Sequence, residues 1–323
     1  MILVTGGAGY IGAHVVKLLS RSGFETVVYD NLSRGHREMV SAGEFVRGEL
    51  SDKNQLLEVM RDRKIDSVIH FAASSLVGES EEDPHRYYQN NIMNGINLLG
   101  AMLEAGVGKI VFSSSAAVYG DPVEVPIRED HPTRPTNVYG DTKLIIEGIL
   151  GKYSAAYGMD SVSLRYFNAA GADPDAEIGE DHTPETHLIP IVLDCALGRR
   201  KEVTIFGTNY ATPDGTCIRD YIHVNDLADA HIRALAHIDR NKGVFSYNLG
   251  NGKGFSVRKV IESTERVTGT KIMVREGAKR KGDPAQLVAS SEKIMKDLGW
   301  KPAFPELDTI IETAWKWHRK RFS

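Results

Sequence analysis

The chain has 323 residues, of which 41% are hydrophobic and 25% charged, as in an ordinary globular protein. The formal net charge is −4 and no apolar run reaches the length of a membrane span, so we expect neither a nucleic-acid nor a membrane partner. The two cysteines, Cys195 and Cys217, lie outside any CxxC spacing. They predict no disulfide framework and no metal site, and they favour a reducing compartment, so we expect a cytoplasmic protein.

Short apolar runs alternate with longer helical patterns through the first half of the chain. The predicted strands lie at residues 2–5, 26–30, 67–73, 109–113 and 161–167, and the predicted helices at 11–21, 55–61, 93–104 and about 139–157. Gly23 and Gly106 follow two of these helices, where glycine is a common stop signal. This alternation predicts βαβ units, and therefore an α/β fold with a Rossmann-type doubly wound parallel sheet.

The alternation is lost after residue 168. Residues 169–184 are rich in Gly, Asp, Pro and Glu and predict a loop, and the rest mixes short strands, loops and helices. We therefore expect a dinucleotide-binding domain over residues 1–167 and a smaller mixed α/β substrate domain over residues 168–323. A strand and helix at about 218–237 are expected to return to the first domain.

A glycine-rich turn joins the first predicted strand to the first predicted helix. Gly6, Gly9 and Gly12 stand in a G-x-x-G-x-x-G spacing. Glycines allow a tight turn and a close approach of pyrophosphate to the backbone, and the helix start offers free N–H groups. A plain turn is the alternative, but the position between strand and helix favours a dinucleotide site.

Asp30 ends the second predicted strand. A carboxylate at this place accepts a hydrogen bond from the adenosine ribose 2′-hydroxyl and repels a 2′-phosphate, so it favours NAD over NADP. The alternative is a turn aspartate without a ligand, and Arg34 and Arg37 are the nearby residues that would favour NADP.

Three polar residues form a candidate catalytic set. Tyr139 and Lys143 are four residues apart and share one helix face, and Ser115 follows a predicted strand, at the sheet edge where ligands bind in open α/β folds. A phenol with a pKa of about 10 is a poor base at neutral pH, and a nearby ammonium lowers that pKa. Chance spacing and a turn-capping serine are the alternatives for each residue taken alone.

Longer motifs support the same interpretation. They are TGGAGYIG at 5–12, VIHFAA at 68–73, VGES at 77–80, YYQNN at 87–91, SSSAAVYG at 113–120, YGDTK at 139–143, LRYFN at 164–168, VTIFG at 203–207, RDYIHV at 219–224 and YNLG at 247–250. With these motifs the chain resembles the extended short-chain dehydrogenase/reductases, and within them the UDP-glucose (UDP-galactose) 4-epimerase family. The resemblance runs nearly from end to end.

The resemblance implies a role for each matching residue. Tyr139 would remove the C4 hydroxyl proton, with Ser115 beside it and Lys143 tuning it. The residues implied to bind NAD are Gly6, Gly9, Tyr10, Ile11, Gly12, Asp30, Asn31, Leu32, Glu49, Leu50, Phe71, Ala72, Ala73, Asn90, Ser113, Tyr139, Lys143 and Phe167. The residues implied to bind the UDP-sugar are Ser115, Asn168, His187, Leu188, Thr204, Phe206, Arg219, Arg280, Asp283 and Leu287, with the arginines on the diphosphate. The family also implies a homodimer formed through helices near residues 87–104 and 139–157.

Three positions depart from the family pattern. Glu49 stands where an aspartate is usual after the third strand, Asp141 where a lysine or a neutral residue is common, and Thr142 where serine is usual in the Tyr-x3-Lys motif. The first departure bears on the contact to adenine.

Ala116 and Ala117 separate the possible reactions. Related 4,6-dehydratases carry an Asp-Glu pair after the strand-end serine, and decarboxylating relatives keep a glutamate, whereas alanines cannot transfer protons. What remains is oxidation at C4 and reduction from the other face, with NAD retained. By resemblance Leu287, or Gln286 with a different gap, gates bulky sugars, so UDP-N-acetylhexosamines are expected substrates too. The alternatives are a UDP-uronate or UDP-pentose 4-epimerase, a reductase, and a non-catalytic nucleotide sensor.

Overall fold

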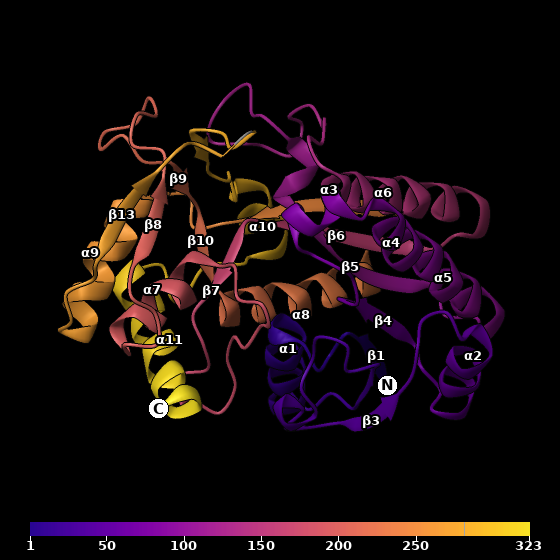
Figure 1. The fold of residues 1–323 in the computed structure, drawn as a ribbon. Coiled ribbons are helices and arrows are strands. Elements are labelled where there is room, and N and C mark those ends of the chain that lie inside the picture. Colours follow the sequence, from indigo (N-terminus) through magenta and orange to yellow (C-terminus); the bar gives the residue numbers. More distant parts are fainter. Residues whose placement is uncertain (281) are drawn as a thin grey trace.

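A parallel sheet forms the centre of the first lobe in the computed structural model, which describes residues 1–280 and 282–323. Within these residues the sheet has seven strands in the order β11-β6-β5-β4-β1-β2-β3, and every neighbouring pair is parallel. The winding reverses between β1 and β4 (Figure 1). The strands are β1 (Ile2–Thr5), β2 (Thr26–Asp30), β3 (Glu44–Arg47), β4 (Ser67–His70), β5 (Lys109–Ser115), β6 (Asp160–Tyr166) and β11 (Val244–Leu249).

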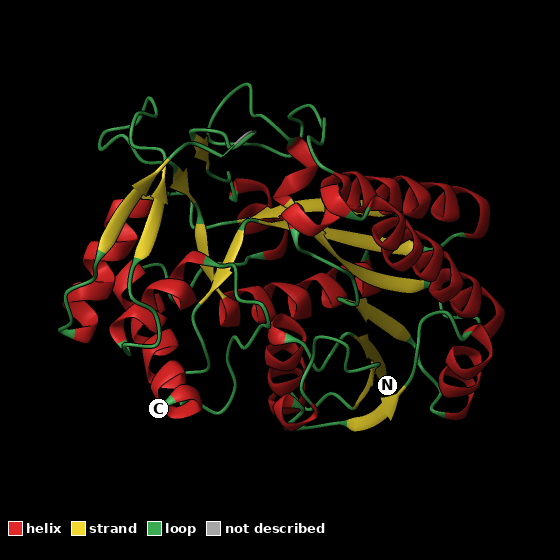
Figure 2. Ribbon diagram, viewed as in Figure 1, coloured by secondary structure: helices red, strands yellow, loops and turns green. Residues whose placement is uncertain are grey.

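Helices cover both faces of this sheet (Figure 2). One face packs against α1 and α8 through a core that includes Val15, Leu19 and Leu227. The other face packs against α2, α5 and α6 through a second core that includes Leu56 and Leu98. These helices are α1 (Tyr10–Arg21), α2 (Lys53–Asp62), α5 (Asn94–Ala105), α6 (Val138–Tyr157) and α8 (Val224–Arg240), and the shorter helical segments are η1 (Arg37–Met39), α3 (Val77–Glu82), α4 (Pro84–Tyr87), η2 (Tyr88–Met93), η3 (Ala116–Tyr119) and α10 (Glu292–Leu298).

The second lobe is built from short strands and three helices. Strand β10 pairs with β7, β8 pairs with β13, and β9 lies between β12 and β14. A separate core between α7, α9 and α11 includes Leu193, Val260 and Ile310. The elements are β7 (Asn168–Ala170), α7 (Leu188–Ala196), β8 (Val203–Phe206), β9 (Ile218–Arg219), β10 (Tyr221–His223), β12 (Phe255–Ser256), α9 (Val257–Thr268), β13 (Val274–Gly277), β14 (Gln286–Leu287) and α11 (Leu307–Phe322).

The predicted doubly wound α/β fold is confirmed, with differences in detail. Strand β4 ends at His70 instead of residue 73, because the N–H groups of Phe71 and Ala72 both donate to the Thr5 carbonyl oxygen. The segment that returns to the first lobe differs from the predicted one at about 218–237: it comprises α8 and β11, whereas Ile218–Arg219 and Tyr221–His223 pair within the second lobe. In the described part of the chain, no helix combines the length and apolar character needed to cross a bilayer.

Candidate active site

The glycine turn between β1 and α1 leaves no room for side chains at two of its positions. Gly6 has a φ of +74°, and a Cβ added there would lie 2.5 Å from the Ala72 nitrogen. A Cβ on Gly12 would lie 2.3 Å from the Gly6 carbonyl oxygen. At Gly9 the nearest contact of a Cβ would be 3.4 Å, so this glycine is less constrained. The turn thus holds the start of α1 close to β1 and β4, with N–H groups of the first helical turn available to an anion.

Asp30 is fixed at the tip of β2, beside this turn. Its Oδ2 accepts from the Ala8 N–H at 3.0 Å and its Oδ1 accepts from the Leu32 N–H at 2.8 Å. Burial raises the pKa of the carboxyl, and the two backbone hydrogen bonds oppose that shift. Each oxygen can accept more than one hydrogen bond, so the carboxylate retains capacity for ribose hydroxyls. Asn31 donates to Glu49 at 3.0 Å, which ties the loop after β2 to the loop after β3.

Most residues implied to bind NAD lie near the carboxyl ends of the parallel strands, around the point where the winding reverses. The glycine turn follows β1, Asp30 ends β2, Phe71 follows β4 and Phe167 follows β6. This edge of the sheet is where open α/β folds bind nucleotides. A turn that a single Cβ would fill, next to a carboxylate at the tip of β2, fits a dinucleotide with free ribose hydroxyls.

Three of the implied NAD residues use their side chains elsewhere. The Tyr10 hydroxyl donates to the Gly171 carbonyl oxygen at 2.6 Å, and Leu50 is buried in the core with α2 and α5. The Asn90 side chain donates to Ser74 at 3.2 Å and to Asn91 at 3.1 Å. Tyr10 and Leu50 can therefore offer only backbone groups to a ligand, a distinction that the sequence does not reveal.

The start of α6 brings Tyr139 to the end of β5. Asn137 caps the helix by accepting from the Gly140 N–H at 2.8 Å. A Cβ on Gly140 would lie 2.4 Å from the Ala117 carbonyl oxygen, so the glycine permits close packing of α6 on η3. Ser115 consequently lies close enough to Tyr139 for its hydroxyl to lower the pKa of the phenol, and its Oγ accepts from the Ala117 N–H at 3.1 Å. The predicted Ser115–Tyr139 neighbourhood is present in the folded chain.

Lys143 is buried behind Tyr139. Its Nζ donates to the Ser113 carbonyl oxygen at 2.7 Å and lies 4.9 Å from the centre of the Phe112 ring and 5.7 Å from that of Tyr139. Burial lowers the pKa of Lys143 to about 7. Burial also raises the pKa of Tyr139, and the Ser115 hydroxyl offsets only part of that shift. The sequence predicted that Lys143 lowers the pKa of Tyr139. In the folded chain the pKa of Tyr139 is instead raised, because the effect of burial dominates.

Because the pKa of Lys143 is lowered in the folded chain, the free energy of unfolding should depend on pH. The unfolded chain keeps this lysine protonated up to a pKa of about 10.4, whereas the folded chain releases the proton near pH 7. Between these values the unfolded state binds more protons, so stability rises with pH. We expect the free energy of unfolding of wild type relative to Lys143→Met to be lowest below pH 7 and to increase as the pH approaches 10. Chemical denaturation across this range measures it, and a difference independent of pH would contradict the assignment.

A buried polar network behind the site was not predicted from the sequence. Glu147 on α6 accepts from Ser114 at 2.5 Å and from the Arg165 guanidinium, whose Nε lies 3.0 Å away. Arg165 also donates to the Tyr119 hydroxyl at 2.9 Å, and Tyr119 donates to Asn248 at 2.7 Å. The network links β5, β6, β11 and α6, and it therefore fixes the strand ends that carry the site.

The two departures in the Tyr-x3-Lys motif have partners in the structure. The Thr142 hydroxyl donates to the Tyr139 carbonyl oxygen at 2.8 Å and accepts from Asn91 at 3.1 Å. Asp141 accepts from the Tyr88 hydroxyl at 3.2 Å. Both residues thus have partners where α6 packs on η2, Thr142 in the buried part of this contact and Asp141 in its exposed part.

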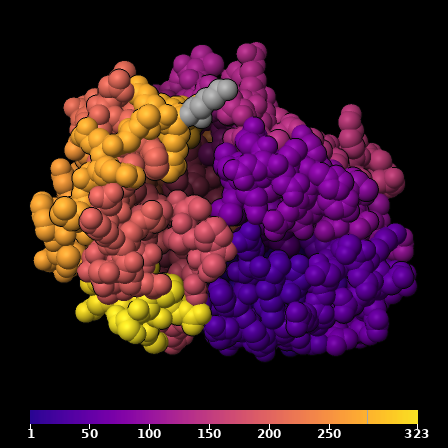
Figure 3. All heavy atoms as spheres, viewed as in Figure 1, coloured from indigo at the N-terminus to yellow at the C-terminus, as the bar shows by residue number. Residues whose placement is uncertain are grey.

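Several residues implied to bind the UDP-sugar gather on one face of the second lobe. Leu287 stands opposite Arg219 in the β14–β9 pair, and its side chain, like that of Phe167, packs against the small core of Val118, Tyr119 and Ile127. Arg219 forms an ion pair with Asp283. The Arg280 guanidinium lies 4.1 Å from the centre of the Phe206 ring. This face adjoins the end of β6, and the space-filling view is hollowed between the two lobes (Figure 3).

Four implied substrate residues have other surroundings. Asn168 donates its backbone N–H to Asp220 at 3.0 Å, and Leu188 begins α7. The Thr204 hydroxyl accepts from Arg275 at 3.3 Å. His187 lies in a cluster with two glutamates and a second histidine, which the sequence analysis did not single out.

The glycine turn, the carboxylate at the tip of β2 and the Ser–Tyr–Lys set together define an extended short-chain dehydrogenase/reductase. The sequence profile of the NAD dependent epimerase/dehydratase family matches residues 2–250, and the chain belongs to this family.

Two solved structures and one curated relative are closely similar. A UDP-glucose 4-epimerase of Halalkalibacterium halodurans is 55% identical over 319 residues, which is 99% of this chain and 96% of the relative. The crystal structure of UDP-glucose 4-epimerase from Brucella ovis in complex with NAD has a TM-score of 0.96 at 48% identity and covers 98% of this chain and 97% of its own. The enzyme from Bifidobacterium longum in complex with NAD+ and UDP has a TM-score of 0.94 at 40% identity, covering 99% and 98%.

Proposed function

We propose that the protein is an isomerase that interconverts UDP-glucose and UDP-galactose by inverting C4 through a transient 4-keto sugar, with NAD as a resident cofactor. The observation that carries this proposal is the placement of Tyr139, at the start of α6, beside Ser115 at the end of β5, followed by alanines where elimination would need an acid and a base. Two relatives named UDP-glucose 4-epimerase support the proposal. They are 55% and 50% identical to this chain over nearly its whole length.

Tyr139 is the proton carrier in this mechanism. Bound NAD supplies hydride acceptance and return at C4. Tyr139 removes the proton from the C4 hydroxyl, and the neighbouring Ser115 hydroxyl can relay that proton. Lys143 Nζ lies 5.7 Å from the centre of the Tyr139 ring and would bind the nicotinamide ribose hydroxyls.

The face around Arg219 and Arg280 is assigned to the UDP-sugar. Arginine forks bind diphosphate oxygens in a bidentate manner, and the ion pair of Arg219 with Asp283 fixes the guanidinium while leaving further N–H donors. Phe206, under Arg280 and 38% exposed, offers a flat apolar surface for the nucleotide. We assign the hydrogen bond to the bound sugar to Ser115, and the packing against the sugar to Phe167 and Leu287.

The proposal is tested by incubating purified protein with UDP-galactose, UDP-N-acetylglucosamine and UDP-glucuronate separately and identifying the products by chromatography. We expect UDP-galactose to give UDP-glucose without added cofactor. A reductase would instead change the ultraviolet absorbance of reduced nicotinamide with each turnover. Conversion of UDP-glucuronate alone would favour a uronate epimerase, and no conversion of any sugar would favour a nucleotide sensor.

Leu287 supports acceptance of N-acetylated sugars as a second substrate class. Successive residues of a strand point to opposite faces, and in β14 it is Leu287 whose side chain packs against the core of Val118, Tyr119 and Ile127, as does Phe167 just after β6. We expect Leu287→Tyr to lower kcat/KM for UDP-N-acetylglucosamine at least tenfold and to change that for UDP-galactose much less. Gln286→Tyr is the matched control. If Leu287→Tyr lowered kcat/KM equally for both sugars, Leu287 would not select between them.

We also assign a homodimer and a cytoplasmic location to the protein, with no nucleic-acid partner. Tyr88 and Met93 on η2 and Tyr157 at the end of α6 are large and exposed, at 38%, 50% and 62%, on the helices that the family resemblance implies for dimerisation. Two free cysteines suit a reducing compartment. Light scattering after size exclusion tests the dimer, and a monomer at micromolar concentration would contradict it.

A further inference from the structure

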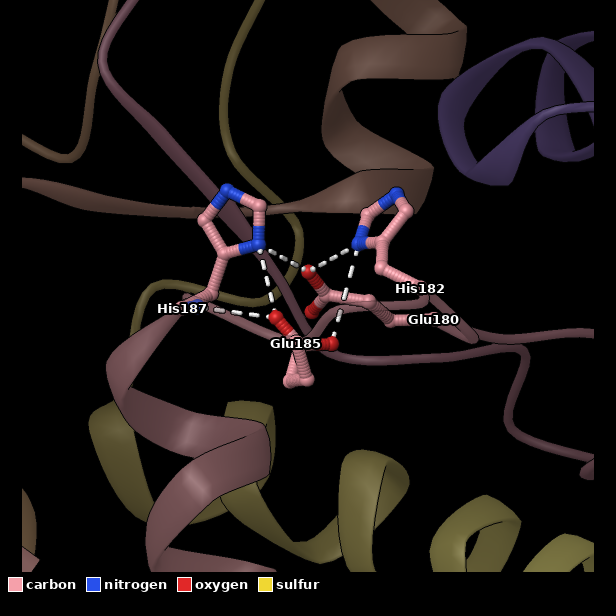
Figure 4. Close-up of side chains that lie close together, drawn as sticks. All are labelled: Glu180, His182, Glu185 and His187. Atoms are coloured by element: carbon pink, nitrogen blue, oxygen red, sulfur yellow. Dashed lines mark hydrogen bonds and ion pairs between the residues drawn. The ribbon is translucent and has the colours of Figure 1, made fainter. Parts of the chain in front are cut away.

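Two histidines and two glutamates converge in the loop between β7 and α7 (Figure 4). Each of Glu180, His182, Glu185 and His187 offers one donor atom, and these four atoms lie within 4.8 Å of one another. Both histidines present Nδ1 to the glutamates. Nothing in the catalytic mechanism uses Glu180, His182 or Glu185.

The donor atoms lie close enough together for one small cation to bind among them. His187 Nδ1 lies 2.7 Å from Glu180 Oε1 and 3.1 Å from Glu185 Oε1, and His182 Nδ1 lies 3.2 Å from Glu180 Oε1 and 3.6 Å from Glu185 Oε2. In a tetrahedral zinc site with bonds of about 2.0–2.1 Å, neighbouring donors lie about 3.3–3.4 Å apart. The two distances from His182 lie near this value, and the two from His187 are shorter.

Hydrogen bonding does not satisfy the cluster. Nδ1 of His182 is buried and has no hydrogen-bond partner among the described residues, although a Glu180 oxygen is 3.2 Å away. The Glu180 side chain is only 8% exposed, and the two imidazole rings lie 5.3 Å apart.

We propose that Glu180, His182, Glu185 and His187 bind one Zn²⁺ ion that clamps the loop between β7 and α7. Two carboxylates neutralise the charge of the ion, and two neutral imidazoles complete a four-ligand set of the kind that zinc prefers. Binding requires both histidines to lose a proton, so zinc affinity increases with pH.

The loop around this cluster contacts the nucleotide turn and the last helix. The Glu180 carbonyl oxygen accepts from Trp317 on α11 at 3.0 Å, and the Thr183 carbonyl oxygen accepts from Arg34 at 2.6 Å. The Tyr10 ring, at the start of α1, lies edge-on to the His182 ring at 6.2 Å. A metal ion here would fix the conformation of a loop that contacts the segment after β2, the start of α1 and α11, so its role is structural.

The test uses full-length, untagged protein, treated with chelator, equilibrated with zinc alone and desalted. We expect one zinc per chain by mass spectrometry, nitrogen and oxygen ligands by X-ray absorption, and a rise in melting temperature on zinc addition. In His187→Ala and His182→Ala, zinc content should fall to background. Because His187 is 45% exposed, its replacement leaves the core intact.

Two controls separate this site from other zinc-binding groups. His36→Gln alters a residue whose ring contacts the Asp181 carbonyl oxygen of the same loop at 3.0 Å, and this variant should keep one zinc per chain. A Cys195→Ser/Cys217→Ser protein should also keep it. Wild type without zinc after equilibration, or histidine variants that load as much zinc as wild type, would overturn the proposal. None of these measurements depends on epimerase activity.

Discussion

Replacing Tyr139 with phenylalanine should lower kcat for UDP-galactose by about 10²–10⁴-fold, the contribution expected of a positioned acid–base group. The variant loses one hydroxyl and keeps the ring that packs against the site. NAD content and UDP binding should therefore stay near those of wild type. Because the buried phenol has a raised pKa and the base form is the deprotonated one, wild-type kcat should rise with pH, and this rise should be absent from the variant.

Tyr88→Phe is the matched control for this variant. Tyr88 is also a tyrosine beside α6, but its side chain is exposed. Its hydroxyl donates to Asp141 at 3.2 Å instead of lying beside Ser115. Its kcat should lie within about twofold of wild type, since a lone surface hydrogen bond contributes little. If Tyr139→Phe were as active as Tyr88→Phe, Tyr139 would not be the proton carrier. Ser115 or a group of the substrate would then have to carry the proton.

Gly12→Ala should abolish retention of NAD by the purified protein. The added Cβ would lie 2.3 Å from the Gly6 carbonyl oxygen and 2.8 Å from the Gly7 Cα, and both are backbone atoms that cannot rotate away. Helix α1 must then move from the turn, which removes the N–H groups that hold the pyrophosphate. Denaturing the purified variant and quantifying the released nucleotide measures the effect, and wild type should release close to one NAD per chain.

Gly9→Ala tests the same turn without the steric conflict. Gly9 has a φ of −80°, which any residue adopts, and its added Cβ would have a nearest contact of 3.4 Å. This variant should keep most of its NAD. If both alanine variants retain the nucleotide equally, the turn is not the pyrophosphate site; if both lose it equally, the steric conflict at Gly12 is not the cause of the loss.

Most of the first lobe could be predicted because its strands and helices carry local signals. Strand β3 was not predicted from its own pattern, because Glu44 and Arg47 make it a half-exposed edge strand with few apolar residues, and only the family resemblance implied a third strand before Glu49. Strand β11 was missed because its membership depends on pairing with β6, far earlier in the chain. The predicted end of β4 was too late because the Thr5 carbonyl oxygen, which is distant in sequence, takes the N–H groups of Phe71 and Ala72.

The candidate site was predicted where spacing alone brings groups together. Ser115 and Tyr139 meet because a strand end and the following helix start are neighbours in a parallel sheet. The pKa of Lys143 could not be predicted, because it depends on burial beneath Phe112 and Tyr139. The Glu-x-His-x2-Glu-x-His spacing at 180–187 is visible in the sequence, but only the fold of the loop shows that the four side chains converge.

The position of β11 in the sheet has a consequence for synthesis of the protein. The ribosome must synthesise the chain through Leu249, and this residue must leave the exit tunnel, before β11 can pair with β6. Strands β7 to β10 have by then all left the tunnel. Until that moment the β6 edge offers unpaired backbone groups to other chains, which is the usual origin of aggregation during folding. The nascent polypeptide is therefore most vulnerable between completion of β6 and emergence of β11.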